Sequence, residues 1–300
     1  MTIAYTVRVP ATSANLGPGF DALGLALSLY DEVTAAVTDQ PTQVEVTGEG
    51  EGELLTDDRH LVVHAMRETF AEVGKQPVGV LLRCANRIPQ ARGLGSSSAA
   101  IVAGVALANA LSGSPLGPRE QLRIAARLEG HPDNVAPCLL GGFTIAWMTG
   151  GAAKAVSMAP HPDIRPTLLV PANRGLTSEA RAALPSTVPH SDAGFNAGRS
   201  ALLVHALTSD PSVLFEATED RLHQDYRAAA MPASAELVRL LRGVGVAAVI
   251  SGAGPSVLAL TALPPRFDPG RRWLTHSLAA ETGGARVTPG NISSTFGHAE

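Results

Sequence analysis

The amino-acid sequence predicts an α+β fold. The first 50 residues alternate polar and apolar side chains in the two-residue period that is typical of antiparallel strands, and long apolar helix patterns follow them. Strand and helix patterns are mixed rather than strictly alternating, which favours α+β over a doubly wound parallel sheet. The segment 158–163 is rich in proline and histidine, so we predict one domain over residues 1–160 and another over residues 161–300.

In the first half, strands are expected before helices. Period-two stretches separated by Gly, Pro and Asp predict strands over residues 5–9, 31–38 and 42–48. A helix is predicted over residues 60–74, and branched residues predict a strand over 78–88. The almost wholly apolar run over 97–113 predicts a buried helix, and a further helix is expected from Pro118 to Glu129.

In the second half, short strands and helices are expected to mix. Strand patterns lie at 152–158, 166–172 and 285–291, and in the apolar stretches VAAVISGAG and SVLALTA. Helices are expected over 178–183, 193–208, 212–225, 233–241 and 269–282.

The charge, the hydropathy pattern and the cysteine content exclude several classes of protein. A net charge of −4 and a pI near 6.1 provide no basic excess for nucleic acid or an anionic membrane. There is no uninterrupted apolar run of about 20 residues and no signal-peptide pattern at the N-terminus, so we expect a cytoplasmic protein. The two cysteines, Cys84 and Cys138, are far apart and are expected to be buried thiols rather than zinc ligands or a disulfide.

Three glycine-rich clusters are the strongest candidates for a binding site: SANLGPGFDALG at 13–24, GLGSSSAA at 93–100 and SGAGPS at 251–256. None follows the dinucleotide or Walker pattern, and none contains a lysine. In the second cluster a strand, a glycine turn and a helix start follow one another, which points several free N–H groups and a positive helix end at one place. That arrangement suits a phosphate, although the serines could instead only cap a buried helix.

A phosphate held without lysine favours a divalent cation beside it. Mg²⁺ prefers oxygen ligands, and Glu129 at the end of a helix and Ser97 in the loop are candidate ligands; Glu129 could also be only a solvated helix-end residue. The segment EGHPDN, residues 129–134, is dense in polar residues for a connector. Asp133 and Asn134 could position or deprotonate an attacking hydroxyl and His131 could bind substrate, or the segment could be an Asx-type turn. Asn15 and Asp21 in the first cluster could likewise form a turn, or could be polar groups held beside a ligand.

His60 and His64 lie four residues apart on an expected helix, as metal ligands can. Apolar residues separate them and the glutamate of the H-E-x-x-H motif is missing, so a structural role is favoured.

Together, these motifs resemble those of the GHMP kinases, a family of small-molecule kinases whose second motif has the form P-x-x-x-G-L-G-S-S. The stretch PQARGLGSS, residues 89–97, fits this form throughout, and the other three motifs occur in the family order from about Val7 to the C-terminus. The resemblance implies a two-domain fold, with an N-terminal domain resembling domain 2 of ribosomal protein S5 and a ferredoxin-like C-terminal domain. It also implies ATP and Mg²⁺ as cofactors and a homodimer.

The resemblance is greatest to members that act on homoserine, and it implies ATP-dependent phosphorylation of the L-homoserine hydroxyl, a step towards threonine. The implied phosphate loop consists of Pro89, Gln90, Ala91, Arg92, Gly93, Leu94, Gly95, Ser96, Ser97, Ser98 and Ala99. The implied magnesium ligands are Ser97 and Glu129, and the implied catalytic residues are Asp133 and Asn134. The implied substrate-binding residues are Asn15, Asp21, His131, Arg181, Arg227, Gly252 and Gly254.

Arg181 and Arg227 are expected to bind the substrate carboxylate, because a planar guanidinium suits a carboxylate. Two alternatives remain at this stage. The first is a kinase of the same family that acts on mevalonate or a sugar, and a neutral sugar would not need paired arginines. The second is a nucleotide sensor without catalysis, which would have no need of Glu129, Asp133 and the serine loop.

Overall fold

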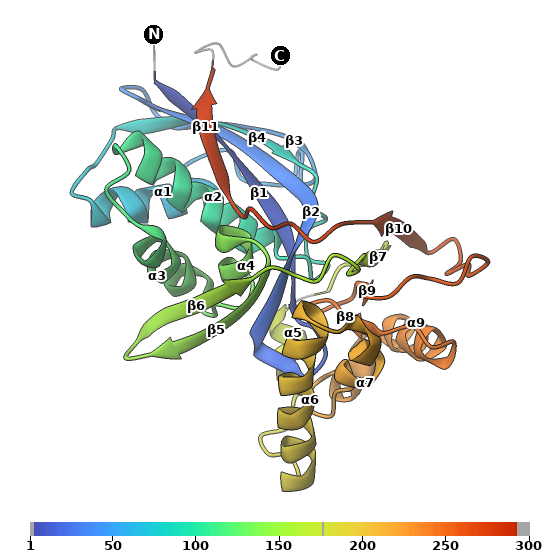
Figure 1. Ribbon diagram of the computed structural model, residues 1–300. Coiled ribbons are helices and arrows are strands. Elements are labelled where there is room, and N and C mark those ends of the chain that lie inside the picture. Colours follow the sequence, from blue (N-terminus) through green and yellow to red (C-terminus); the bar gives the residue numbers. More distant parts are fainter. Residues whose placement is uncertain (1–2, 176, 293–300) are drawn as a thin grey trace.

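The computed structural model describes residues 3–175 and 177–292 and confirms the α+β class (Figure 1). The larger sheet has seven strands in the described part of the chain, in the order β11-β1-β2-β4-β3, with a β5–β6 hairpin attached to β2. Among the strands described here, β3 and β4 are the one pair that runs parallel. The strands are β1 (Ala4–Asn15), β2 (Gly19–Thr38), β3 (Gln43–Gly48), β4 (Gly79–Asn86), β5 (Phe143–Thr149), β6 (Ala152–Met158) and β11 (Arg286–Gly290).

Four helices pack together beside this sheet (Figure 1). They are α1 (Leu61–Glu72), α2 (Ser96–Leu111), α3 (Pro118–Glu129) and α4 (Val135–Leu140). The central helix is α2, which packs on β1 and on the other three helices, so most of its circumference is buried. This explains why its sequence is small and apolar all round instead of amphipathic, whereas α3 has a polar outer face.

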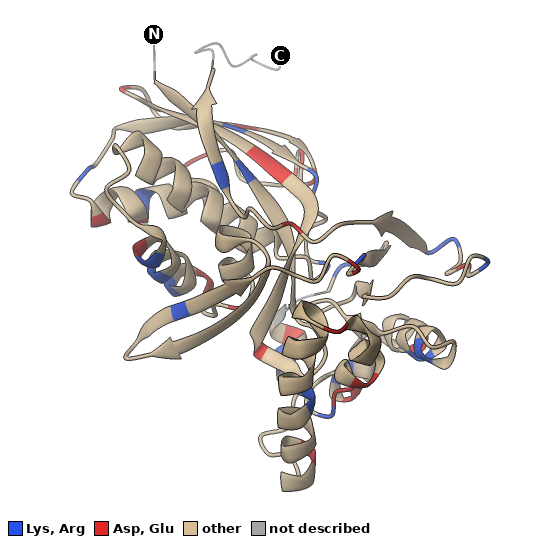
Figure 2. Ribbon diagram, viewed as in Figure 1, with Lys and Arg blue, Asp and Glu red and all other residues tan. Residues whose placement is uncertain are grey.

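A four-stranded antiparallel sheet forms the second half, in the order β10-β7-β9-β8. Its strands are β7 (Thr167–Pro171), β8 (Ala248–Ile250), β9 (Val257–Ala259) and β10 (Trp273–Ser277). The helices are α5 (Thr177–Ala182), α6 (His190–Thr208), α7 (Leu214–Ala217), α8 (Gln224–Arg227) and α9 (Pro232–Gly243), with 3-10 turns η1 (Pro211–Val213) and η2 (Ala228–Ala230). Figure 2 shows acidic and basic segments interspersed over both halves.

The two halves share one hydrophobic core. A single buried cluster includes Val7 of β1, Leu168 of β7, Leu203 of α6 and Val249 of β8. The chain also returns to its first sheet at the end, because β11 pairs with β1. The domain boundary at residue 160 stays a prediction.

Several sequence-based expectations about single elements were wrong. The helix expected over 269–282 is replaced by strand β10, because Trp273–Ser277 pairs with β7. The helix expected over 212–225 is divided into η1, α7 and α8, and a turn around Asp220 separates α7 from α8. Strand β2 is twenty residues long and begins inside the first glycine cluster, at Gly19. No helix in the described ranges is both long and apolar enough to cross a membrane.

Candidate active site

The second glycine cluster forms a loop that leads directly into α2. Gly95 is the N-cap of α2 and has no side chain that could bond the first turn, so the N–H groups of that turn remain available to a ligand. Helix α2 is sixteen residues long, and the positive end of its dipole lies at the same place. The predicted order of strand, glycine turn and helix start is confirmed, and the geometry suits a phosphate.

The third glycine cluster packs against this loop. The Ser251 hydroxyl donates to the carbonyl oxygen of Gly93 at 2.7 Å. A Cβ at Gly93 would lie 2.1 Å from the carbonyl oxygen of Ser251 and 2.8 Å from the nitrogen of Gly254. Only glycine permits this close approach. Residues 93 and 251, far apart in sequence, therefore form one surface.

A polar pocket of about 440 Å³ opens beside the start of α2. Most of the predicted site residues line it, from all three glycine clusters and from the 129–134 segment. They are Asn15, Asp21, Ala91, Arg92, Gly93, Leu94, Gly95, Ser96, Ser97, Glu129, His131, Asp133, Asn134, Arg181, Arg227 and Gly252. We call this cavity the acceptor pocket.

Oxygen ligands meet at one side of the acceptor pocket. The Ser97 and Ser98 hydroxyls both donate to the same Glu129 carboxylate oxygen, at 2.7 and 2.9 Å. The predicted hydroxyl and carboxylate are thus in direct contact, although they come from different helices. Serine and glutamate oxygens beside a phosphate-binding loop are a donor set that fits Mg²⁺.

The 129–134 segment presents a buried carboxylate to the same pocket. Asp133 is 3% exposed, and its Oδ1 lies 2.7 Å from Nδ1 of His131. This hydrogen bond raises the pKa of His131, while burial opposes the rise. The Asn134 side-chain oxygen accepts from the Thr12 hydroxyl at 2.8 Å, and this bond fixes the orientation of the amide.

The two predicted arginines are in different electrostatic states. Arg181 forms two hydrogen bonds to the Asp21 carboxylate, both of 2.9 Å, so its charge is paired. Arg227 is 2% exposed and forms no ion pair in the described part of the chain. Burial, followed by the nearby charge of Arg181, lowers the pKa of Arg227. The charges of Asp21, Asp220 and Asp133 oppose this lowering, but none of these carboxylates forms an ion pair with Arg227. A buried cation that has no ion pair within the described part of the chain therefore faces the pocket.

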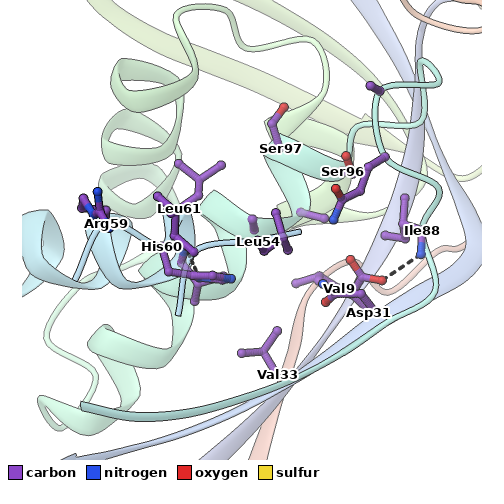
Figure 3. A pocket seen from close by; sticks show the side chains of 17 residues that line it. Val9, Asp31, Val33, Leu54, Arg59, His60, Leu61, Ile88, Ser96 and Ser97 are labelled. Atoms are coloured by element: carbon purple, nitrogen blue, oxygen red, sulfur yellow. Dashed lines mark hydrogen bonds between the residues drawn. The ribbon is translucent and has the colours of Figure 1, made fainter. Parts of the chain in front are cut away.

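A second and more apolar pocket of about 370 Å³ lies on the other side of the phosphate loop. It shares Ala91, Ser96 and Ser97 with the acceptor pocket, so the loop separates the two cavities. Its lining includes Val9, Val33, Leu54, Leu61, Asp31 and His60 (Figure 3). We call it the nucleoside pocket because its size and apolar walls suit a flat base.

His60 and Asp31 are the buried titratable groups of the nucleoside pocket. The Nε2 atom of His60 is buried and has no hydrogen-bond partner among the described residues. The Asp31 carboxylate accepts from the backbone N–H of Ile88 at 2.9 Å (Figure 3) and from that of Arg87 at 2.6 Å. Burial raises the pKa of Asp31 to about 6.

Not every predicted residue lines the acceptor pocket. Gln90 and Ala99 line the nucleoside pocket, whereas Pro89, Ser98 and Gly254 line neither cavity. Sequence reasoning did not identify Thr12, Phe20 or His223, which contact site residues directly. Phe20 lies inside the first glycine cluster but was given no role there, whereas Thr12 and His223 lie outside the three glycine clusters and the 129–134 segment. Only the folded geometry shows their contacts with the site.

Comparisons with known proteins match both halves of the chain. The family model described as GHMP kinases N terminal domain matches residues 60–142, and the GHMP kinases C terminal model matches residues 203–269. A homoserine kinase of Streptomyces coelicolor is 54% identical over 293 residues, 95% of this chain and 95% of that protein. One from Clavibacter michiganensis is 53% identical over 92% of this chain and 86% of that protein.

Solved structures show the same architecture. The crystal structure of homoserine kinase from Cytophaga hutchinsonii has a TM-score of 0.82 at 26% identity and covers 96% of this chain and 98% of that one. The mevalonate diphosphate decarboxylase of Staphylococcus aureus has a TM-score of 0.68 over 96% of this chain and 98% of that chain, and its 18% identity shows a common fold alone.

Proposed function

Since this chain belongs to the GHMP kinase family, we propose that it transfers the γ-phosphoryl group of ATP to the side-chain hydroxyl of L-homoserine. The product is O-phospho-L-homoserine, on the route to threonine. The observation that carries the choice of substrate is Arg227, a buried cation in the acceptor pocket that forms no ion pair with any residue the structure describes. Such a group is stabilised by a bound carboxylate.

We infer that the two pockets bind different substrates, the nucleoside pocket ATP and the acceptor pocket homoserine. We assign the base of ATP to the nucleoside pocket and its phosphates to the N–H groups at the start of α2. Homoserine fits the acceptor pocket with its carboxylate on Arg227 and Arg181. Asp21 and Asn15 then supply oxygens for its ammonium group.

The reaction needs positioning more than covalent help. The homoserine hydroxyl oxygen attacks the γ-phosphorus and its proton is released to solvent. The bond from that phosphorus to the β–γ bridging oxygen breaks, and ADP leaves. We assign Asp133 to orient the hydroxyl, with its own carboxylate held by His131. The serine loop and helix end stabilise the negative charge on the transferred group.

We assign Ser97 and Glu129 to hold Mg²⁺, since their oxygens already lie within contact distance. The ion would neutralise charge on the β- and γ-phosphates. We further propose a homodimer in the cytoplasm, on the family resemblance. Sedimentation of the purified protein tests the dimer.

The alternative activities fit the pocket less well. A sugar offers no anion to Arg227, whereas mevalonate offers a carboxylate but no ammonium group for Asp21. A sensor without catalysis would not need a buried Asp133 beside the acceptor site.

The proposal is tested by ADP release in a coupled assay with Mg²⁺-ATP and each of L-homoserine, mevalonate and galactose. We expect rapid turnover with homoserine, and phosphorylation at the side-chain oxygen confirmed by phosphorus NMR. Absence of turnover with homoserine, or faster turnover with either other acceptor, would overturn the proposed function.

A further inference from the structure

His223 is a buried group outside both pocket linings that the proposed reaction does not use directly. Its side chain is fully buried, with 0% exposure. The Asp220 carboxylate accepts from the backbone N–H groups of Leu222, His223 and Gln224, at 2.9, 3.2 and 2.8 Å. This turn fixes the backbone of His223 at the start of α8, one turn before Arg227.

The partners of His223 determine its tautomer. Its Nε2 lies 2.7 Å from the carbonyl oxygen of Gly17, which can only accept, so Nε2 carries the proton. Its Nδ1 lies 3.2 Å from NH1 of Arg227, which can only donate, so Nδ1 is unprotonated. Nε2 also lies 3.5 Å from Oδ2 of Asp220, which likewise can only accept. These contacts require the neutral Nε2–H tautomer. Burial, together with the charge of Arg227, lowers the pKa of His223, although the charge of Asp220 opposes this lowering.

The same contacts hold the guanidinium of Arg227. NH1 donates to His223, and Nε donates to the carbonyl oxygen of Ala180 at 3.0 Å. The ring of Phe20 stacks on His223 at 5.2 Å and lies 5.3 Å from the guanidinium carbon of Arg227. The remaining N–H groups of Arg227 are therefore available to the acceptor pocket.

We propose that His223 is a positioning residue for the recognition of the substrate carboxylate. Its Nδ1 orients Arg227, and its Nε2 fixes His223, and with it Arg227, to Gly17 of the first glycine cluster. This inference rests on the proposed function, because it assigns the ligand of Arg227. It adds a residue that contacts no substrate and still determines how strongly the carboxylate is bound.

Two isosteric substitutions separate the contacts. In His223→Asn the side-chain oxygen can replace Nδ1 as the acceptor for Arg227, whereas in His223→Gln the amide nitrogen can replace Nε2 as the donor to Gly17. We expect H223Q to raise the homoserine KM about tenfold or more, the factor for one lost hydrogen bond to a charged group, with the ATP KM nearly unchanged. We expect H223N, which keeps an acceptor for Arg227 and loses the bond to Gly17, to raise the homoserine KM less than H223Q does.

A second readout tests carboxylate recognition itself. L-Homoserinol has a CH₂OH group in place of the carboxylate. The ratio of kcat/KM for homoserine to that for homoserinol therefore measures how much carboxylate binding by Arg181 and Arg227 contributes. H223Q should lower this ratio, and H223N should lower it less. His205→Gln, the same change at an exposed position on α6, is the matched control.

Equal impairment of H223Q and H223N, a parallel rise in the KM of ATP, or an unchanged homoserine-to-homoserinol ratio in H223Q would overturn the inference. If H223Q does not fold, nitrogen NMR of histidine-labelled wild-type protein at pH 8 decides, and a His223 protonated at Nδ1 contradicts the proposal. Wild-type turnover of homoserine is measured first. Its absence rejects the proposed function, whereas normal turnover with an unaffected H223Q rejects the role of His223 alone.

Discussion

Asp31 and Arg227 are both buried at the site, but their charged groups are bound by the protein to different extents. Asp31 is satisfied by the backbone, because its Oδ1 accepts from two N–H groups next to the phosphate loop. Arg227 donates hydrogen bonds only to neutral groups in the described part of the chain, and the nearby carboxylates of Asp21, Asp220 and Asp133 form no ion pair with it, so its N–H groups can bind an anionic ligand. Burial alone thus does not identify a binding residue; a missing counter-ion on a pocket wall does.

Asp31→Asn is expected to stabilise the protein at alkaline pH. Burial raises the pKa of Asp31 from 3.8 to about 6 in the folded state, so the folded protein binds this proton more tightly than the unfolded chain. The contribution of Asp31 to stability therefore falls as the pH rises from about 4 to above 6, and its cost above pH 6 is on the order of 1–3 kcal/mol. An asparagine oxygen can accept both backbone bonds without this cost.

Urea unfolding at pH 8 and pH 4.5 measures the effect. We expect a higher free energy of unfolding for D31N than for wild type at pH 8, and a smaller difference at pH 4.5. Asp39→Asn, at an exposed turn, is the control and should show no such trend. An equal difference at both pH values would contradict the prediction.

At the scale of elements, the start of α2 determines the geometry of the site. Gly95 has a φ of +67°, and a Cβ there would lie 2.0 Å from the Thr12 hydroxyl. Gly95→Ala therefore requires both a strained backbone and a displaced Thr12, which orients Asn134. We expect the ATP KM to rise at least about tenfold. A shift of the first turn of α2 would move its N–H groups away from the phosphates of ATP.

Gly113→Ala is the matched control for this prediction. Gly113 follows the other end of α2, has a φ of +87° and would place its Cβ in open space. It carries comparable backbone strain without touching the site, so its ATP KM should stay near wild type. Equal ATP KM values for the two variants, from steady-state kinetics, would show that the contact with Thr12 has no role.

Elements with a strong local pattern could be predicted from the sequence, and elements created by pairing could not. The apolar run of α2 and the Gly130 end of α3 were clear in the sequence and are confirmed. Strand β10 has a helix-compatible sequence and becomes a strand only by pairing with β7. Likewise the motifs identified most of the acceptor pocket, whereas Phe20 and His223 became visible only when α8 packed on the first glycine cluster.

At the scale of the molecule, the acceptor pocket lies where the two halves meet. Asn15 of β1 donates to the carbonyl oxygen of Gly252, which follows β8, and Gly252 in turn donates its N–H to Ala14. Arg181 and Arg227 come from helices of the second half, while Asp21 and the phosphate loop belong to the first. An active site of this kind requires both halves to be folded at once.

The shared core makes a further prediction about unfolding. Residues of both sheets belong to one buried cluster, and β11 closes the first sheet after the second has been completed. We therefore expect both halves to unfold together. The two tryptophans report on them separately, because Trp147 lies on β5 and Trp273 on β10.

Trp273→Phe leaves fluorescence from the first sheet alone, and Trp147→Phe leaves it from the second. Each variant is titrated with urea, and its fluorescence midpoint is compared with its own circular dichroism midpoint to correct for the effect of the substitution on stability. The corrected fluorescence midpoints of the two variants should coincide. Two separated midpoints would show that the halves unfold independently, and the pocket between them would then be lost before the more stable half. Coincident midpoints would mean that any substitution destabilising one half also lowers the population of the intact acceptor pocket.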